Sequence, residues 1–112
     1  MPSIKTNQAA NGIVIGSGDT TLLNPTAGRG AVTFASLHEQ TGATETIELF
    51  ISPDATSAAG ERLDTIIFAA DETLQPASML LTVPSGFFLI GKATTGGLVE
   101  SNISFTQYSG SS

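Results

Sequence analysis

The sequence contains no cysteine, no tryptophan and one tyrosine among its 112 residues. The absence of cysteine excludes disulfide bonds, thiolate metal sites and thiol nucleophiles, and it leaves the redox compartment open. A chain of this length forms one domain and buries roughly two thirds of the surface that its unfolded form exposes. Its core must therefore come from aliphatic side chains and six phenylalanines, packed without covalent cross-links.

Positive charge and long apolar runs are also scarce. Four basic residues against ten acidic ones give a net charge of −6, which repels a phosphate backbone, so we expect no nucleic-acid partner. No run reaches the ~18 to 20 apolar residues that a membrane span needs. The first five residues lack the apolar stretch of a secretory signal. We therefore expect no membrane partner and a product made in the cytoplasm.

Short segments rich in Val, Ile, Thr and Phe alternate with turn residues that recur roughly every eight to twelve positions. This rhythm predicts an all-β fold, an antiparallel β-sandwich or jelly-roll-like single domain over residues 11–108. Residues 54–62 are rich in alanine but have no apolar stripe, so we expect a loop with at most one helical turn. We expect residues 1–10 to form a flexible arm and residues 109–112 a flexible tail. The predicted strands are 12–16, 20–23, 30–38, 44–52, 63–69, 78–83, 86–93 and 99–108.

Two predicted strands show clear alternation between apolar and polar residues. Ile47, Leu49 and Ile51 share one face of their strand, while Glu48 points to the other. In the last segment, Val99, Ile103 and Phe105 share one face, while the even-numbered positions from 100 to 106 are all polar. Both patterns indicate strands with one buried and one solvated face.

Residues 66–68 and 87–90 are apolar on both strand faces. Such a strand is either central between two packed layers or covered by another subunit, and we expect the second for at least one of them. An N-terminal arm that lies over a neighbouring molecule would add contacts there, as would the single amphipathic aromatic ring. The predicted protein contacts are Ile4, Lys5, Phe87, Phe88, Ile90 and Tyr108.

The sequence offers one candidate for catalytic chemistry, the pair His38 and Glu39. A serine triad needs a histidine beside a serine and a carboxylate that orients the ring, but the sequence has no G-x-S-x-G elbow. We interpret His38 as a surface residue at the end of a strand that turns at residues 40–42. The chain is therefore predicted to have no catalytic residue and not to be an enzyme.

Metal and phosphate sites have equally weak signals. Asp71, Glu72 and Asp54 do not follow the spacing of a calcium loop, and adjacent carboxylates usually mark a solvated turn. Residues 16–19 lack the third glycine of a dinucleotide fingerprint and the lysine of a P-loop, so we interpret them as a hairpin turn. Residues 28–30 and 96–97 are interpreted in the same way. No metal and no cofactor is predicted.

A family resemblance rests on an ordered series of turns and strands. From residues 31–36 onward, the chain is similar to small virion proteins of tailed bacteriophages, whose motifs include a Thr-Gly turn and a strand that ends in Leu-Tyr-x-x-Pro. The resemblance covers roughly residues 20 to 108, although the Gly-Phe-Phe-Leu-Ile-Gly run is more apolar than its counterpart and the loop after Pro53 is longer. The matching segments are residues 40–43, 49–53, 70–74, 84–94 and 99–105.

The resemblance implies a structural virion protein, and the negative charge and the two-sided apolar strands favour a capsid decoration or cement protein. Such a protein would bind the major capsid protein on the outer surface of a phage head and stabilise the shell, after synthesis in the host cytoplasm. A homotrimer is the expected oligomer. The alternative is a receptor- or glycan-binding module of a tail or fibre, with a binding pocket on the loops at residues 54–62 or 94–98.

Overall fold

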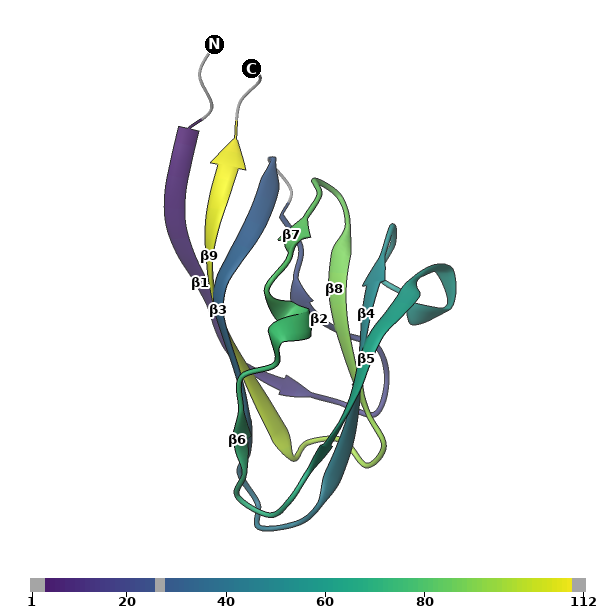
Figure 1. The fold of residues 1–112 in the computed structure, drawn as a ribbon. Coiled ribbons are helices and arrows are strands. Elements are labelled where there is room, and N and C mark those ends of the chain that lie inside the picture. Colours follow the sequence, from purple (N-terminus) through teal and green to yellow (C-terminus); the bar gives the residue numbers. More distant parts are fainter. Residues whose placement is uncertain (1–3, 26–27, 110–112) are drawn as a thin grey trace.

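The computed structural model describes residues 4–25 and 28–109, with the side chains of Ile4 and Ser109 left out (Figure 1). The described residues form nine β-strands and two short 3₁₀ turns. The elements are β1 (Ile4–Ile15), β2 (Thr20–Leu23), β3 (Arg29–Glu39), β4 (Glu45–Ser52), η1 (Ser57–Ala59), β5 (Glu61–Phe68), β6 (Thr73–Leu74), η2 (Ala77–Met79), β7 (Thr82–Val83), β8 (Phe88–Ala93) and β9 (Val99–Ser109).

The strands form two antiparallel sheets. Sheet A has the order β1-β9-β3-β6, with β7 also paired to β3, and sheet B has the order β2-β8-β4-β5. The chain changes sheet at almost every connection; only β4 to β5 and β6 to β7 stay within one sheet. Two interleaved sheets connected in this way form a jelly roll, so the predicted all-β sandwich is confirmed.

The core lies between the inner faces of the two sheets. Ile47 and Leu49 of β4 pack there against Val99 and Ile103 of β9, and all four are fully buried. The even-numbered positions of both strands are more exposed, apart from Ser52 at the end of β4. Both alternating patterns seen in the sequence therefore indicate the inward faces correctly.

The structure differs from the sequence analysis at residues 4–10, which were expected in a flexible arm. They form the first part of β1 and pair with β9, from Ile4 opposite Ser109 to Ala10 opposite Ile103. Polar cross-strand contacts support the pairing: Gln8 Nε2 donates to Gln107 Oε1 at 2.9 Å. This part of sheet A extends beyond the core, so backbone hydrogen bonds and not apolar side chains hold it in place. Its sequence therefore lacks the alternation of apolar and polar residues that marks a half-buried strand. The rest of the predicted arm, and residues 110–112 of the predicted tail, lie outside the described residues.

Two smaller differences occur between β5 and β8. Residues 78–83 were predicted as one strand, but Ala77–Met79 form the 3₁₀ turn η2 and Thr82–Val83 form β7. Met79 is the buried residue of that turn. The segment is apolar because Met79 inserts into the core, not because the segment is a strand. Thr73–Leu74 lies outside the predicted strands and forms the short strand β6 against β3.

The loop between β4 and β5 folds back over the outer face of sheet B. Its 3₁₀ turn η1 agrees with the single helical turn allowed for residues 54–62. The Ser57 amide donates to Asp19 Oδ2, just before β2, at 2.9 Å. Since β8 lies between β2 and β4, this bond carries the loop across β8. Ser52, at the end of β4, is fully buried below the loop and donates its hydroxyl to the Thr56 carbonyl at 2.7 Å.

Gly60 is the residue at which this loop approaches β4 most tightly. A Cβ atom there would lie 2.5 Å from the Ile51 carbonyl oxygen and 2.7 Å from Ser52 Cβ. We expect Gly60→Ala to lower the free energy of unfolding by about 1–3 kcal/mol in urea denaturation, because backbone must move to admit the methyl group. The control is Gly18→Ala, whose Cβ would meet nothing within 4 Å. Equal stabilities of the two variants would contradict the tight packing.

Candidate functional site

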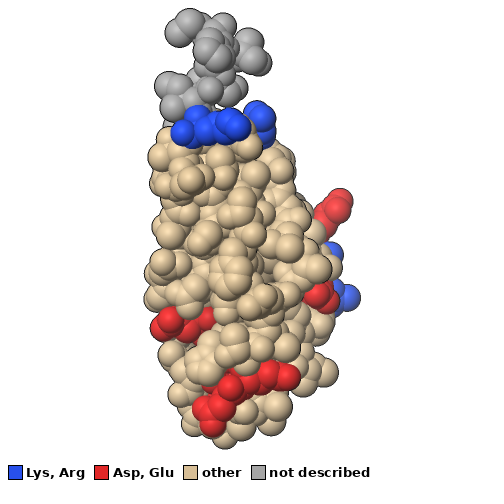
Figure 2. Space-filling model, turned by 60° about the vertical axis from the view of Figure 1, so that its left-hand side comes forward, with Lys and Arg blue, Asp and Glu red and all other residues tan. Residues whose placement is uncertain are grey.

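One end of sheet A carries a cluster of two cations around an aromatic ring. The strand register places Lys5 of β1 and Arg29 of β3 on either side of Tyr108 of β9. The Arg29 guanidinium carbon lies 4.6 Å from the ring centroid, and Lys5 Nζ lies 5.9 Å from it. Both distances suit cation–π attraction. We call these three residues the basic tip, and Figure 2 shows its blue side chains at one end of the molecule.

Phe87 lies on a tight turn between β7 and β8. The Phe87 amide donates to the Pro84 carbonyl at 3.0 Å, and Gly86 has a φ of 80°, a conformation that glycine adopts without steric cost. Two bonds tie this turn to the loop after β2. The Gly86 amide donates to the Pro25 carbonyl at 3.0 Å, and Asn24 Nδ2 donates to the Phe87 carbonyl at 2.8 Å. The Phe87 side chain, 36% exposed, is therefore presented on a fixed loop.

The structure brings together some of the predicted contact residues and separates others. Lys5 and Tyr108 share the basic tip, and Phe87 is exposed on its turn. Phe88 is half-buried at the start of β8, opposite Ser52. Ile4 begins β1, but its side chain lies outside the described part of the structure.

Ile90 is corrected by the structure. It was expected to contact another subunit, yet it is fully buried within its own chain. Leu89, on the opposite face of β8, is fully buried in the core. β8 is a central strand, and the β4–β5 loop crosses its outer side, so the same chain covers both faces. The sequence pattern could not distinguish a covering loop from a covering subunit.

The outer face of sheet A holds two shallow hollows that meet at Thr33. One is about 220 Å³ and is lined partly by Phe34 and Leu80, which are 44% and 53% exposed. The other is about 430 Å³ and is lined mainly by small and polar side chains of β1, β3 and β9. Figure 2 shows a broad tan surface between the blue end and the red end of the molecule.

The sequence does not show that Phe34 is exposed or that Arg29 lies beside Tyr108. A bulge between Val32 and Phe34 shifts the register of β3 against β9 and turns Phe34 outward. Arg29 was read as part of a glycine turn, whereas it begins β3 opposite Tyr108. Neither position has a local signal in the sequence, because both depend on pairing with a distant strand.

The opposite end of the sandwich contains two buried carboxylates. Glu39, fully buried at the end of β3, accepts bonds from the amides of Gly42 at 2.9 Å and Asp71 at 3.0 Å. It also accepts bonds from the Thr41 hydroxyl at 2.5 Å and the Thr41 amide at 3.2 Å. Glu39 therefore ties the β3–β4 turn to the β5–β6 turn, where Asp71 has a φ of 58°.

Glu45 fixes one further turn, the one between β8 and β9. It is almost fully buried at the start of β4 and accepts bonds from the amides of Thr46, Thr95 and Gly96, at 2.9 to 3.2 Å. The turn between β8 and β9 is thus fixed to β4. These carboxylates satisfy turn amides, and their bonds explain why charged residues are buried here.

The remaining candidates for chemistry have structural partners. His38 Nδ1 lies 2.6 Å from Thr73 Oγ1 on the outer face of sheet A. Asp54 precedes β5 and Asp71 follows it, so an eight-residue strand separates these two carboxylates. Within the described residues, no group of three His, Cys, Asp or Glu side chains is placed to hold a metal ion. Residues 16–19 connect β1 in sheet A to β2 in sheet B, so the predicted hairpin there was wrong.

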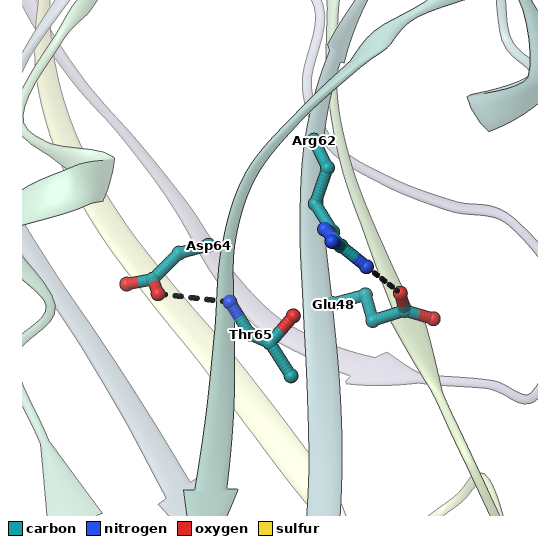
Figure 3. A network of polar contacts seen from close by, with 4 residues as sticks. All are labelled: Glu48, Arg62, Asp64 and Thr65. Carbon is teal, nitrogen blue, oxygen red and sulfur yellow. Dashed lines mark hydrogen bonds and ion pairs between the residues drawn. The ribbon is translucent and has the colours of Figure 1, made fainter.

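The outer face of sheet B carries an exposed ion pair. Arg62 Nη1 lies 3.2 Å from Glu48 Oε2, with side chains 61% and 37% exposed (Figure 3). Exposed pairs of this kind contribute about 0–1 kcal/mol. Asp64, on the opposite face of β5, accepts a bond from the Thr65 amide at 2.8 Å and one from the Ser78 hydroxyl at 2.9 Å (Figure 3). The second bond links β5 of sheet B to η2 beside sheet A.

No helix among the described residues is long and apolar enough to cross a membrane.

Comparisons with known proteins identify the fold and go no further. No protein-family model matches the sequence, and no curated protein sequence matches it. A chain of the Bacillus endospore appendages, a family of disulfide-linked pili, is 15% identical, with 98% of this chain and 90% of that chain covered and a TM-score of 0.58. At this identity the likeness shows a shared fold alone.

Two further structures are less similar. PirA is 14% identical over 93% of this chain and 92% of its own, with a TM-score of 0.39. A chain of the T13 IBDV viral particle is 8% identical over 93% of this chain and 31% of its own, also with a TM-score of 0.39. These TM-scores are too low to support an inference.

The bonds to Glu39 predict a specific acid sensitivity. The Thr41 hydroxyl and the amides of Asp71, Gly42 and Thr41 outweigh the effect of burial and lower the pKa of Glu39 from 4.5 to about 2. A carboxyl whose pKa is lower in the folded state contributes stability that is fully present above about pH 4.5 and is lost as the pH falls toward 2.

We expect Glu39→Gln to lower the free energy of unfolding at pH 7 and to flatten its decline between pH 4.5 and 2, measured by urea denaturation across that range. The control Glu48→Gln removes a carboxylate from the exposed ion pair and should change stability at pH 7 by no more than about 0.5 kcal/mol. Asp19 and Asp54, whose pKa values are also lowered by hydrogen bonds, remain in both variants. Parallel pH profiles for the two variants would rule out this role for Glu39.

Proposed function

We propose that the protein is a non-catalytic structural subunit of a virion, a capsid decoration protein that binds the outer surface of a phage head and stabilises the shell. The Phe87 turn is the observation that carries this proposal. An exposed aromatic ring on a loop fixed by two hydrogen bonds loses little entropy when it enters a pocket of a partner. Aromatic anchors of this type commonly dominate protein interfaces. The proposed partner is the major capsid protein.

The fold and the charge are compatible with this role. A jelly roll held together by packing and hydrogen bonds suits a compact subunit, and one structural neighbour with a shared fold is a chain of an assembled pilus. Those pili are described as disulfide-linked. This sequence contains no cysteine, so contacts between copies of this protein or with a partner would be non-covalent. The net charge of −6 would keep coated particles apart through mutual repulsion.

A second candidate function is glycan binding by a tail or fibre module. A shallow hollow of about 250 Å³ lies beside the predicted loop at residues 94–98, and four threonines line it together with Glu45 and Ile67. Hydroxyl groups beside an apolar side chain suit contacts with a sugar ring. A glycan array separates the two functions, because a decoration protein should bind none of the sugars.

We expect Phe87→Asp to weaken binding to phage heads assembled without the protein by about 2 kcal/mol or more, measured by co-sedimentation. A carboxylate in an apolar pocket loses its hydration without gaining a partner. The matched control is Ile67→Asp, which adds the same charge at a side chain that is 74% exposed on β5. The proposal fails if wild-type protein does not bind these heads, or if both variants bind as the wild type does.

A further inference from the structure

The outer face of sheet A has opposite charges at its two ends. Tyr108, with Lys5 and Arg29 beside it, is at one end of β9, and Glu100 is near the other. Glu100 lies opposite Val14 on β1 and His38 on β3. Between these ends the face shows no charged side chains in Figure 2. The side chain of Phe34 is exposed on it.

We infer that this face binds a second copy of the same chain, with the strands of the two copies antiparallel. Two identical faces can oppose each other around a twofold axis that lies in the plane between them. If that axis ran along the strands, the basic tips would meet and repel. If it runs across the strands, the basic tip of each copy lies over the Glu100 end of the other. Charge complementarity therefore selects the second arrangement.

The strand register places the apolar contact at the centre of this arrangement. A twofold axis across the strands keeps β9 opposite β9 and inverts positions along it, so Tyr108 faces Glu100 when the axis passes at Ser104. Phe34 and Ala9 are the register partners of Ser104 on the neighbouring strands. Phe34 consequently meets Phe34 of the second copy, where two rings can stack. Small residues such as Ala9 and Ser104 let the two sheets approach.

The ends of the face fit as well as its centre. Lys5 lies level with Tyr108, and Val14 lies level with Glu100. In the pair, the aliphatic stem of Lys5 covers the exposed side chain of Val14 while its ammonium group reaches Glu100. The same contact recurs at the other end, because a twofold interface repeats every contact.

The dimensions of the face predict a reversible dimer. Nine steps of about 3.3 Å separate Lys5 from Val14 along β1, and four strand widths of about 4.8 Å span the sheet. This corresponds to roughly 500 Å² per copy, or about 1,000 Å² in total, which is the lower limit for a specific interface. The dimer should therefore dissociate on dilution and weaken with salt.

The paired face and the proposed capsid contact are different surfaces of the molecule. Phe87 lies on the turn before β8 of sheet B, so pairing through sheet A leaves it accessible. A twofold pair also differs from the trimer expected from the family resemblance, and a mass measurement decides between them.

A charge-swap experiment with the full chain tests the pairing. Light scattering of the wild-type protein should give a mass near twice the 11.4 kDa of one chain at high concentration. The variant Lys5→Glu/Arg29→Glu and the variant Glu100→Lys should each dimerise roughly a hundredfold more weakly, because like charges then meet at both ends. Mixing the two variants should restore a dimer, since each altered end meets its complement.

The mixture controls for folding, because a misfolded variant would not regain a partner. Ile67→Asp, on the other sheet, should dimerise like the wild type. A wild-type monomer at all concentrations, a trimer, or a mixture that stays monomeric would each overturn the inference. If Phe87→Asp loses capsid binding but still dimerises, the capsid contact and the dimer contact are shown to be different surfaces.

Discussion

The pairing of β9 with β1 on one side and with β3 on the other determines which side chains lie next to each other on the outer face of sheet A. This register sets Lys5 and Arg29 beside Tyr108, and it sets Val14 and His38 beside Glu100. Because successive residues of a strand point to opposite faces, a shift by one position would move all of these side chains into the core and bring Ile103 and Phe105 to the surface. The burial of the inner face of β9 therefore also fixes the arrangement of its outer face.

The two ends of the sandwich are closed by different physical means. At the end with the buried carboxylates, Glu39 and Glu45 accept bonds from the amides of three turns, and these charge-assisted bonds offset the cost of burial. At the other end, the Phe87 turn is tied to the loop after β2 by neutral backbone and amide bonds. The first end is polar and satisfied within the chain, whereas the second presents an aromatic ring to solvent. This asymmetry supports a contact role for the Phe87 end.

Sheet A and sheet B also differ in what covers their outer faces. The β4–β5 loop lies across β8 of sheet B, where Ile90 is fully buried, whereas Ile67 on the edge strand β5 stays exposed. Sheet A has no such cover over its central strands among the described residues, and Phe34 and Leu80 remain exposed beside small polar residues. The proposed roles follow this division, with self-association through sheet A and capsid binding through the turn that precedes β8.

Local sequence patterns were sufficient to determine the fold class, the inward faces of β4 and β9, and the loop with one helical turn between β4 and β5. These features depend on alternation and turn chemistry within a few residues, so they can be read without knowing the partners of a strand. The segment at residues 4–10 could not be recognised as a strand, because its stability comes from backbone bonds to a strand about a hundred residues away. Phe34 and Arg29 were missed for the same reason, since a bulge and a distant register decide where they point. The sequence by itself thus determined which residues could be buried, while the tertiary structure alone decided which exposed residues share a surface, because that depends on pairing between segments far apart in the chain.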